Sequence, residues 1–160
     1  MIIIRSKYFS EESKERPIDK KDMAIAGVGL GGSAASLVHV NKWGENYLNR
    51  DINEINIRHS KNYMDYANKQ GLSKKDAAQK LRSAINEMSH GSKAQLKAAE
   101  EAATKSGNKI AQSMVSAAKS GKLARKHGKL AAISAGVGLG SLAAIKYRDH
   151  KWKKDQNNQE

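Results

Sequence analysis

Two glycine-rich segments with nearly the same sequence and almost no charge constrain the fold of this chain more than any other feature. The first reads AIAGVGLGGSAASLVHV at residues 24–40, and the second reads AISAGVGLGSLAAIKY at residues 132–147. Each glycine costs a water-exposed helix about 1 kcal/mol relative to alanine. Repeated glycines in a helix therefore require close packing that offsets this cost, unless the segments are phosphate-binding loops.

The glycine pattern of the two segments does not support nucleotide binding. A Walker loop requires a lysine directly after its second glycine, and neither segment has one there. The dinucleotide fingerprint requires a preceding strand within a β-α-β unit, and no alternation of strands and helices surrounds either segment. We therefore expect no nucleotide cofactor, and no other cofactor is indicated.

Placed on a helix, each segment presents a ladder of small side chains at every fourth position. Each ladder contains a GxxxG pattern, which allows the backbone of a second helix to approach closely. The ladders are Gly27, Gly31 and Ala35 in the first segment, and Ala132, Gly136, Gly140 and Ala144 in the second. Larger apolar side chains lie on the opposite side of each helix. The pattern predicts a glycine-zipper face for helix packing, either between the two segments or between copies of the chain, and this close packing is equally compatible with a membrane.

The uncharged runs within these segments are marginal in length for a membrane span. Met23–Val40 has 18 residues and Leu130–Ile145 has 16, whereas a spanning helix needs about 20 and at least about 17. Lysines at both ends can extend the runs by snorkelling. Trp43 follows the first run, and Tyr147 and Trp152 follow the second, as in the aromatic belt of a membrane interface. Tyr147 and Trp152 are interleaved with Lys and Arg, which also suits phosphate contact and stacking on nucleic acid. Two interpretations stay open: packing within protein alone, and insertion into a membrane at some stage.

The sequence pattern in the rest of the chain is typical of helices. Apolar residues recur at steps of three and four through the middle of the sequence. Serines stand at the expected helix starts and glycines at the expected helix ends, namely Ser73, Ser92, Gly71, Gly107 and Gly121. We predict an all-α chain of extended or loosely bundled helices, about six in number.

Five regions are expected along the chain. A short extended arm at residues 1–22 precedes the first glycine-rich apolar helix at 23–40. A basic helical region covers residues 41–129, the second glycine-rich apolar helix covers 130–147, and a basic and polar tail covers 148–160. The arm begins with the apolar residues MIII, and two interpretations stay open for it: docking on a partner by strand addition, and a disordered tail.

The chain is strongly basic, with 29 Lys and Arg against 16 Asp and Glu, a formal net charge of +13. Residues 41–129 hold most of the excess. Such a charge favours polyanions, namely nucleic acid, anionic lipid or an acidic protein surface, although a solvated basic helix surface has the same composition. The residues predicted to contact a polyanion are Lys119, Lys122, Arg125, Lys126 and Lys129 in one stretch, and Lys151, Lys153 and Lys154 in another.

No residue pattern points to catalysis. The five histidines are scattered without metal-site spacing, and the chain has no cysteine. His39 lies in an apolar segment, where a packed or interfacial role is expected ahead of a ligand role. We therefore expect a non-enzymatic protein with no catalytic residue, no metal and no small-molecule substrate.

The segments AIAGVGLGGSAASLV and AISAGVGLGSLAAI, together with the start MIIIRSKYFS, give the chain a resemblance to small internal virion proteins of tailed bacteriophages. Proteins of that kind are basic and helical, carry glycine-rich apolar helices, and are packaged in the particle or ejected with the genome. The resemblance implies a virion protein that assists genome delivery. It implies other virion proteins or further copies of the chain as partners, together with DNA or the host membrane.

Three functional hypotheses follow for the chain. The first is the virion protein, located in the particle or in the host cytoplasm before assembly, whose two apolar helices insert into the host membrane during infection. The second is a basic protein that binds or condenses nucleic acid. The third is a membrane-active protein similar to a bacteriocin or a holin.

Overall fold

The computed structural model describes residues 16–158, and within them the chain forms five helices and no strand. The helices are α1 (Lys20–His59), α2 (Lys61–Lys69), α3 (Lys74–His90), α4 (Lys93–Lys105) and α5 (Lys109–Asn157). The predicted all-α class is thereby confirmed. Of the arm predicted at residues 1–22, residues 1–15 lie outside the described part, and Lys20 already begins α1.

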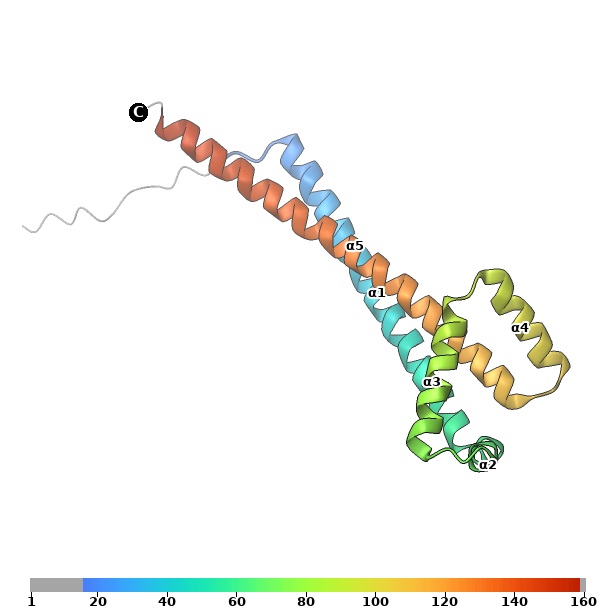
Figure 1. Cartoon of the computed structure of the whole chain (residues 1–160). Helices are drawn as coiled ribbons and strands as arrows, with labels where there is room; N and C mark the ends of the chain where they lie inside the picture. The colour runs from blue at the N-terminus through green and yellow to red at the C-terminus, as the bar shows by residue number, and fades with distance from the viewer. Residues whose placement is uncertain (1–15, 159–160) are drawn as a thin grey trace, which may run out of the picture.

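The two long helices α1 and α5 determine the shape of the molecule. They contact each other more extensively than any other pair and run side by side in opposite directions, while α2, α3 and α4 gather at one end (Figure 1). At 1.5 Å per residue, the 40 residues of α1 span about 60 Å and the 49 residues of α5 about 73 Å. We call the paired segments Met23–Val40 and Leu130–Ile145 the shaft, and residues 50–126 the head.

The helix ends follow local signals in the sequence. Ser73 accepts a hydrogen bond from the backbone N–H of Asp76, and Ser92 forms a capping box with Gln95, as predicted from their positions. Gly71, with φ of +64°, ends the turn that follows α2, because this left-handed conformation favours glycine. Each of these signals acts within a few residues, so that its place could be predicted from the sequence.

The long helices differ from the prediction of about six shorter ones. The first glycine-rich segment does not end near residue 40, because α1 continues without a break to His59. Gly121, predicted to end a helix, lies inside α5 and is buried. A Cβ at this position would lie 3.3 Å from Cδ of Arg50 and 3.6 Å from Cβ of Ser89. Gly121 therefore allows α1 and α3 to approach α5 closely instead of ending a helix.

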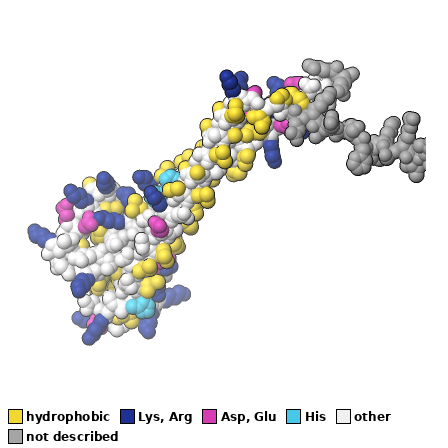
Figure 2. Space-filling view, turned by 180° about the vertical axis from the view of Figure 1, so that it is seen from behind, with side chains coloured by type: hydrophobic (Ala, Val, Ile, Leu, Met, Phe, Trp, Pro, Cys, Tyr) yellow, Lys and Arg dark blue, Asp and Glu magenta, His cyan; other side chains and the backbone are white. Residues whose placement is uncertain are grey.

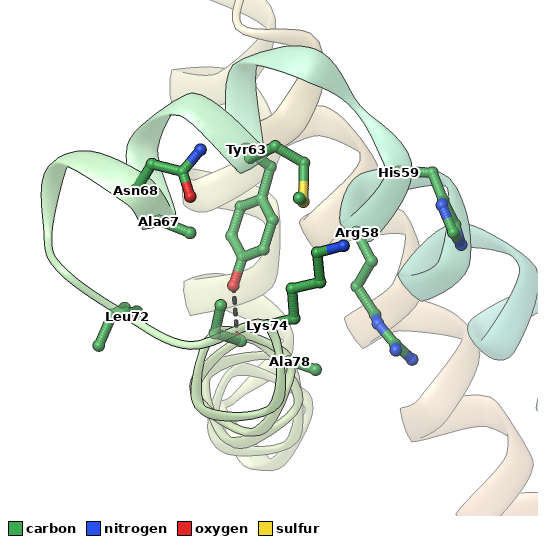
Figure 3. A pocket seen from close by; sticks show the side chains of 10 residues that line it. Arg58, His59, Tyr63, Ala67, Asn68, Leu72, Lys74 and Ala78 are labelled. Atoms are coloured by element: carbon green, nitrogen blue, oxygen red, sulfur yellow. Dashed lines mark hydrogen bonds between the residues drawn. The ribbon is translucent and has the colours of Figure 1, made fainter.

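The apolar core lies in the head, where the end of α1 packs with α2, α3 and the start of α5. Its buried members are Ile57, Tyr63, Ala67, Ala77, Leu81, Ile85 and Ala117. The Tyr63 hydroxyl donates a hydrogen bond of 2.5 Å to the carbonyl oxygen of Ala77, and this bond joins α2 to α3 beside a pocket of about 140 Å³ (Figure 3). The Arg82 guanidinium lies 2.9 Å from the buried carboxylate of Glu54, which joins α3 to α1.

Candidate membrane surface and basic groove

The two helices of the shaft approach each other through glycine and serine. A Cβ at Gly29 would lie 2.8 Å from Cβ of Ser141, and a Cβ at Gly138 would lie 2.7 Å from Oγ of Ser33. A Cβ at Gly32 would lie 2.9 Å from the carbonyl oxygen of Ser134. Real Cβ atoms do not approach other atoms this closely, so Gly29 and Gly32 accept only glycine in the observed arrangement, whereas at Gly138 the nearest atom is a serine hydroxyl oxygen. The matched segments therefore pack against each other.

This contact corrects the predicted packing face. In the described residues, no atom of another side chain or helix lies within 4 Å of a Cβ at Gly27, Gly31, Gly136 or Gly140. Ala132 is also exposed, and Ala35 and Ala144 are half-buried. Gly29 is two residues from Gly27, a rotation of about 200° around the helix. The prediction failed for the contact within the chain because it counted glycine and alanine as small but gave serine no weight.

Three of the four serines in the shaft donate hydrogen bonds within the protein. Ser33 donates to the carbonyl oxygen of Gly29 at 3.0 Å, and Ser141 donates to that of Val137 at 3.0 Å, each within its helix. Ser36 of α1 donates to the carbonyl oxygen of Ala131 of α5 at 3.2 Å, and so bonds across the pair. Because these donors have partners inside the protein, the shaft does not depend on water to satisfy them.

The outer surface of the shaft is apolar and exposed. Leu30 and Leu139 are 73% and 68% exposed. The other large exposed side chains here are Met23, Val28, Leu37, Val38, Val40, Ile133, Val137 and Leu142. In Figure 2, hydrophobic side chains extend along the shaft, whereas Lys and Arg occur at its two ends and over the head. A continuous apolar surface of this kind is uncommon on soluble monomers and marks a contact with protein or membrane.

Both long helices are long and apolar enough, by length and composition, to cross a membrane. Each contains an 18-residue window of sufficient hydropathy, and only 6% of the window in α1 and 17% of that in α5 is buried. An apolar helix in the core of a soluble protein would be mostly buried. The exposure of these windows therefore distinguishes them from core helices.

A cluster of charges closes the end of the shaft at which α1 begins. The Asp22 carboxylate lies 2.6 Å from the Arg16 guanidinium and 2.8 Å from Nε of Arg148. Arg148 also pairs with Asp19, the N-cap of α1. The hydrogen bond from Arg16, followed by that from the Asp19 backbone N–H, holds the pKa of the Asp22 carboxyl far below its usual value. The cluster ties the start of α1 to the end of α5.

Two histidines meet where the shaft joins the head. Nδ1 of His39 on α1 lies 3.1 Å from Nδ1 of His127 on α5, and the ring centroids are 5.3 Å apart. Burial is the main cause that lowers the pKa of His127, and the charges of His39, Lys42 and Lys126 lower it further. Within residues 16–158 no group of three or more metal-ligating side chains occurs. The geometry gives His39 a packing contact between the long helices, which sequence spacing could not reveal.

The predicted aromatic belt residues lie at the two ends of the shaft. Trp43 lies beside Gly128 at the head end, where a Cβ on the glycine would be 3.3 Å from Cδ1 of the indole. Tyr147, which is largely exposed, and Trp152 lie near the opposite end on α5. This placement brackets the shaft with aromatic residues. Their role at a membrane interface stays a prediction.

A basic groove runs between α4 and α5, with the end of α3 beside it. Its volume is about 970 Å³, and it contains all five residues of the first predicted polyanion stretch. The lining residues are Ser89, His90, Lys93, Leu96, Lys97, Glu100, Lys119, Lys122, Leu123, Arg125, Lys126 and Lys129. Lys151, Lys153 and Lys154 belong to the opposite end of α5, about 33 Å from Lys129 along the helix. The predicted polyanion residues thus form two separate groups.

No protein-family model, curated protein or solved structure matches this chain. The arrangement of its own residues therefore carries the functional argument. That arrangement combines a glycine-packed shaft with an apolar outer surface, a charged cluster at one end of the shaft and a histidine pair at the other, and a basic groove beside the histidine end.

Proposed function

We propose that this is a non-enzymatic, membrane-active protein whose shaft inserts into a lipid bilayer as a helical hairpin. The observation that carries the proposal is the exposure of large apolar side chains along two helices whose closest contacts are made at glycine and serine. In water such an arrangement leaves the apolar surface unburied, whereas in a bilayer the same surface faces lipid. Small residues between the helices and large ones outside are typical of membrane helix pairs.

The dimensions of the shaft support insertion. At 1.5 Å per residue, Met23–Val40 spans about 27 Å and Leu130–Ile145 about 24 Å, close to the hydrocarbon thickness of about 30 Å. Lysines adjoin both ends of the shaft, namely Lys20, Lys21, Lys42, Lys129 and Lys146. Their long side chains can reach the headgroups from slightly short helices. Insertion would place the head on one side of the membrane and the described ends of the chain on the other.

The energetics favour a conditional insertion over a permanent anchor. Each shaft segment contains six Leu, Ile or Val residues, and each of these favours insertion by about 0.3–0.6 kcal/mol. The gain of about 2–4 kcal/mol per segment is reduced by glycine, serine and His39. Because the helices are already paired and three of their four serine hydroxyls donate hydrogen bonds within the protein, the shaft can enter as one unit. A soluble form that inserts later is consistent with this balance.

Release of a fluorescent dye from liposomes tests the proposal directly. The wild-type protein is expected to release dye, and the double variant Leu30→Lys with Leu139→Lys is expected to release almost none. Each lysine near the middle of the shaft adds about 2.5–3.5 kcal/mol to the cost of insertion, while the exposed positions leave folding in water unaffected. The control is Leu48→Lys with Ile55→Lys, which places two lysines at exposed apolar positions of α1 outside the shaft.

Two outcomes would contradict membrane insertion. One is the absence of dye release by a wild-type protein that circular dichroism shows to be helical. The other is equal release by the shaft variant and the control variant, since insertion requires the centre of the shaft to enter lipid.

The biological setting that we propose is a tailed bacteriophage particle, and its support is the sequence resemblance. In that setting the protein travels with the genome, contacts other virion proteins or its own copies, and assists DNA delivery through the host membrane. Detection of the protein in purified particles would support the setting. Its absence from particles, together with growth arrest when it is expressed in a bacterial cell, would favour the bacteriocin-like or holin-like alternative.

Nucleic-acid binding is the second candidate function, and the charge of residues 41–129 favours it. DNA affinity measured against salt concentration separates it from the first, because each phosphate contact that releases a counterion steepens the salt dependence. A flat dependence would reject DNA binding without affecting the membrane proposal.

A further inference from the structure

We propose that the basic groove binds the phosphate headgroup of an anionic phospholipid in the same bilayer that receives the shaft. This inference rests on the proposed membrane insertion and adds a lipid preference to it. Three observations carry it: uncompensated positive charge, an apolar floor, and the position of the groove next to the shaft.

The positive charge of the groove is largely uncompensated. Its only carboxylate within the described residues is that of Glu100, which pairs with Lys119. Lys122 donates a hydrogen bond of 2.6 Å to the carbonyl oxygen of Gly91, and Arg125 donates to that of Ser89. These carbonyls fix the two side chains without neutralising them. The other lining cations that make no ion pair within residues 16–158 are Lys93, Lys126 and Lys129.

The floor of the groove is apolar and lacks an aromatic stacking surface. Two leucines line the groove together with the lysines: Leu96 is buried, and Leu123 is 45% exposed. No Trp, Tyr or Phe occurs among the lining residues of the described chain. Single-stranded nucleic acids are bound by basic residues together with aromatic side chains on which bases stack. A basic rim above leucine side chains instead suits an anion with an apolar portion, as in a phospholipid.

The position of the groove identifies the bilayer as the source of the ligand. Lys129 directly precedes Leu130, the first residue of the second shaft segment. Along α5, Lys126 lies about 4.5 Å and Lys122 about 10.5 Å farther from the shaft. The headgroup layer on each side of a bilayer is about 5–8 Å thick. With the shaft inserted, Lys129 and Lys126 therefore lie at headgroup depth, where anionic lipids attract basic residues.

Vesicle binding tests the lipid preference. Flotation assays compare phosphatidylcholine vesicles with vesicles in which phosphatidylglycerol replaces part of the phosphatidylcholine. We expect the wild type to bind the anionic vesicles at least about tenfold more tightly. The variant Lys93→Glu with Lys126→Glu, which reverses one charge on each wall of the groove, is expected to lose this preference. It should still bind neutral vesicles and release dye from them as the wild type does.

The matched control is Lys75→Glu with Lys80→Glu. It makes the same change in net charge at two exposed positions of α3 outside the groove. The control is expected to keep most of the anionic preference. An unchanged preference in the groove variant would overturn the inference, and so would an equal loss in the control, because either result would show that only net charge matters.

A water-soluble lipid tests binding in the groove independently of membrane insertion. Dihexanoyl phosphatidylglycerol is expected to shift the backbone amide signals of Leu123 and Lys126 in the wild type but not in the groove variant. If these shifts occur but the wild type releases no dye from any vesicle, the proposed insertion is rejected and the proposed lipid site is supported. Absence of the shifts overturns the lipid site. Displacement of the lipid by a DNA duplex that binds more tightly would also overturn it and assign the groove to nucleic acid.

Discussion

The head and the shaft are built from the same two long helices, but they use opposite packing. In the head, large apolar side chains such as Ile57, Leu81 and Ile85 point inward and are nearly inaccessible to solvent. In the shaft, glycine and serine make the closest contacts between the helices, while most leucine, isoleucine and valine side chains are exposed. Burial of apolar surface stabilises the head in water. The shaft gains close backbone contact but buries little apolar area, so its outer surface fits lipid better than water.

The largest effect that tests this comparison is expected from truncating one leucine in each region. Leu81→Ala in the head is expected to lower the free energy of unfolding by about 2–5 kcal/mol, because Leu81 is 3% exposed and its removal leaves a cavity. Leu30→Ala in the shaft is expected to change it by less than about 0.5 kcal/mol. Urea denaturation followed by circular dichroism measures both. A large loss for Leu30→Ala would show that the outer face of the shaft is covered in water.

Enlarging the shaft glycines gives a smaller effect and tests which face is in contact. Gly138→Leu is expected to destabilise the protein by about 1–3 kcal/mol, since a Cβ there already lies 2.7 Å from Oγ of Ser33 and 3.4 Å from the carbonyl oxygen of Gly29, and a leucine side chain extends beyond the Cβ. Gly136→Leu is the matched control, because no other part of the described chain lies within 4 Å of a Cβ there. Thermal unfolding compares the two. If Gly136→Leu were the more harmful variant, the shaft helices would pack through the other face.

The charged cluster at the end of the shaft predicts a sensitivity to acid. Because the pKa of Asp22 is lowered in the folded protein, its contribution to stability is present above the usual carboxyl pKa. That contribution is lost as the pH falls toward the lowered value. Asp22→Asn is expected to lower the urea midpoint at neutral pH and to reduce the loss of stability in acid. Asp65→Asn, at an exposed position of α2, is the control. Parallel curves of the urea midpoint against pH for the wild type and Asp22→Asn would contradict a stabilising role of the cluster.

The histidine pair predicts the smallest effect, which is a change in stability between about pH 7 and pH 5. The pKa of His127 is lowered in the folded protein, so the unfolded chain binds more protons in this range. Stability should therefore fall as the pH drops below about 6.5. His127→Gln is expected to flatten this part of the curve of unfolding midpoint against pH. His150→Gln, at an exposed position, should leave it unchanged. A curve equally steep in His127→Gln would assign the titration to other groups.

Features that depend on residues a few positions apart in the sequence could be predicted from the sequence. The all-α class, the N-caps Ser73 and Ser92, and the helix ends near Gly71 and Gly107 were all predicted correctly. Gly121 was predicted wrongly, because its role depends on Arg50 and Ser89, which approach it from other helices. A glycine that ends a helix and a glycine that admits a neighbouring helix look alike in a single sequence.

The sequence by itself determined that the chain is helical, that two matched glycine-rich segments carry almost no charge, and that the middle of the chain is strongly basic. Helix propensity, capping and charge are properties of single residues or of residues a few positions apart. Only the tertiary structure decided that Gly29 meets Ser141, that His39 meets His127, and that the lysines of α4 and α5 line one groove. The first two contacts join residues about 90 to 110 positions apart. They depend on the antiparallel register of α1 and α5, because on a helix a shift of two residues turns a side chain to the opposite face.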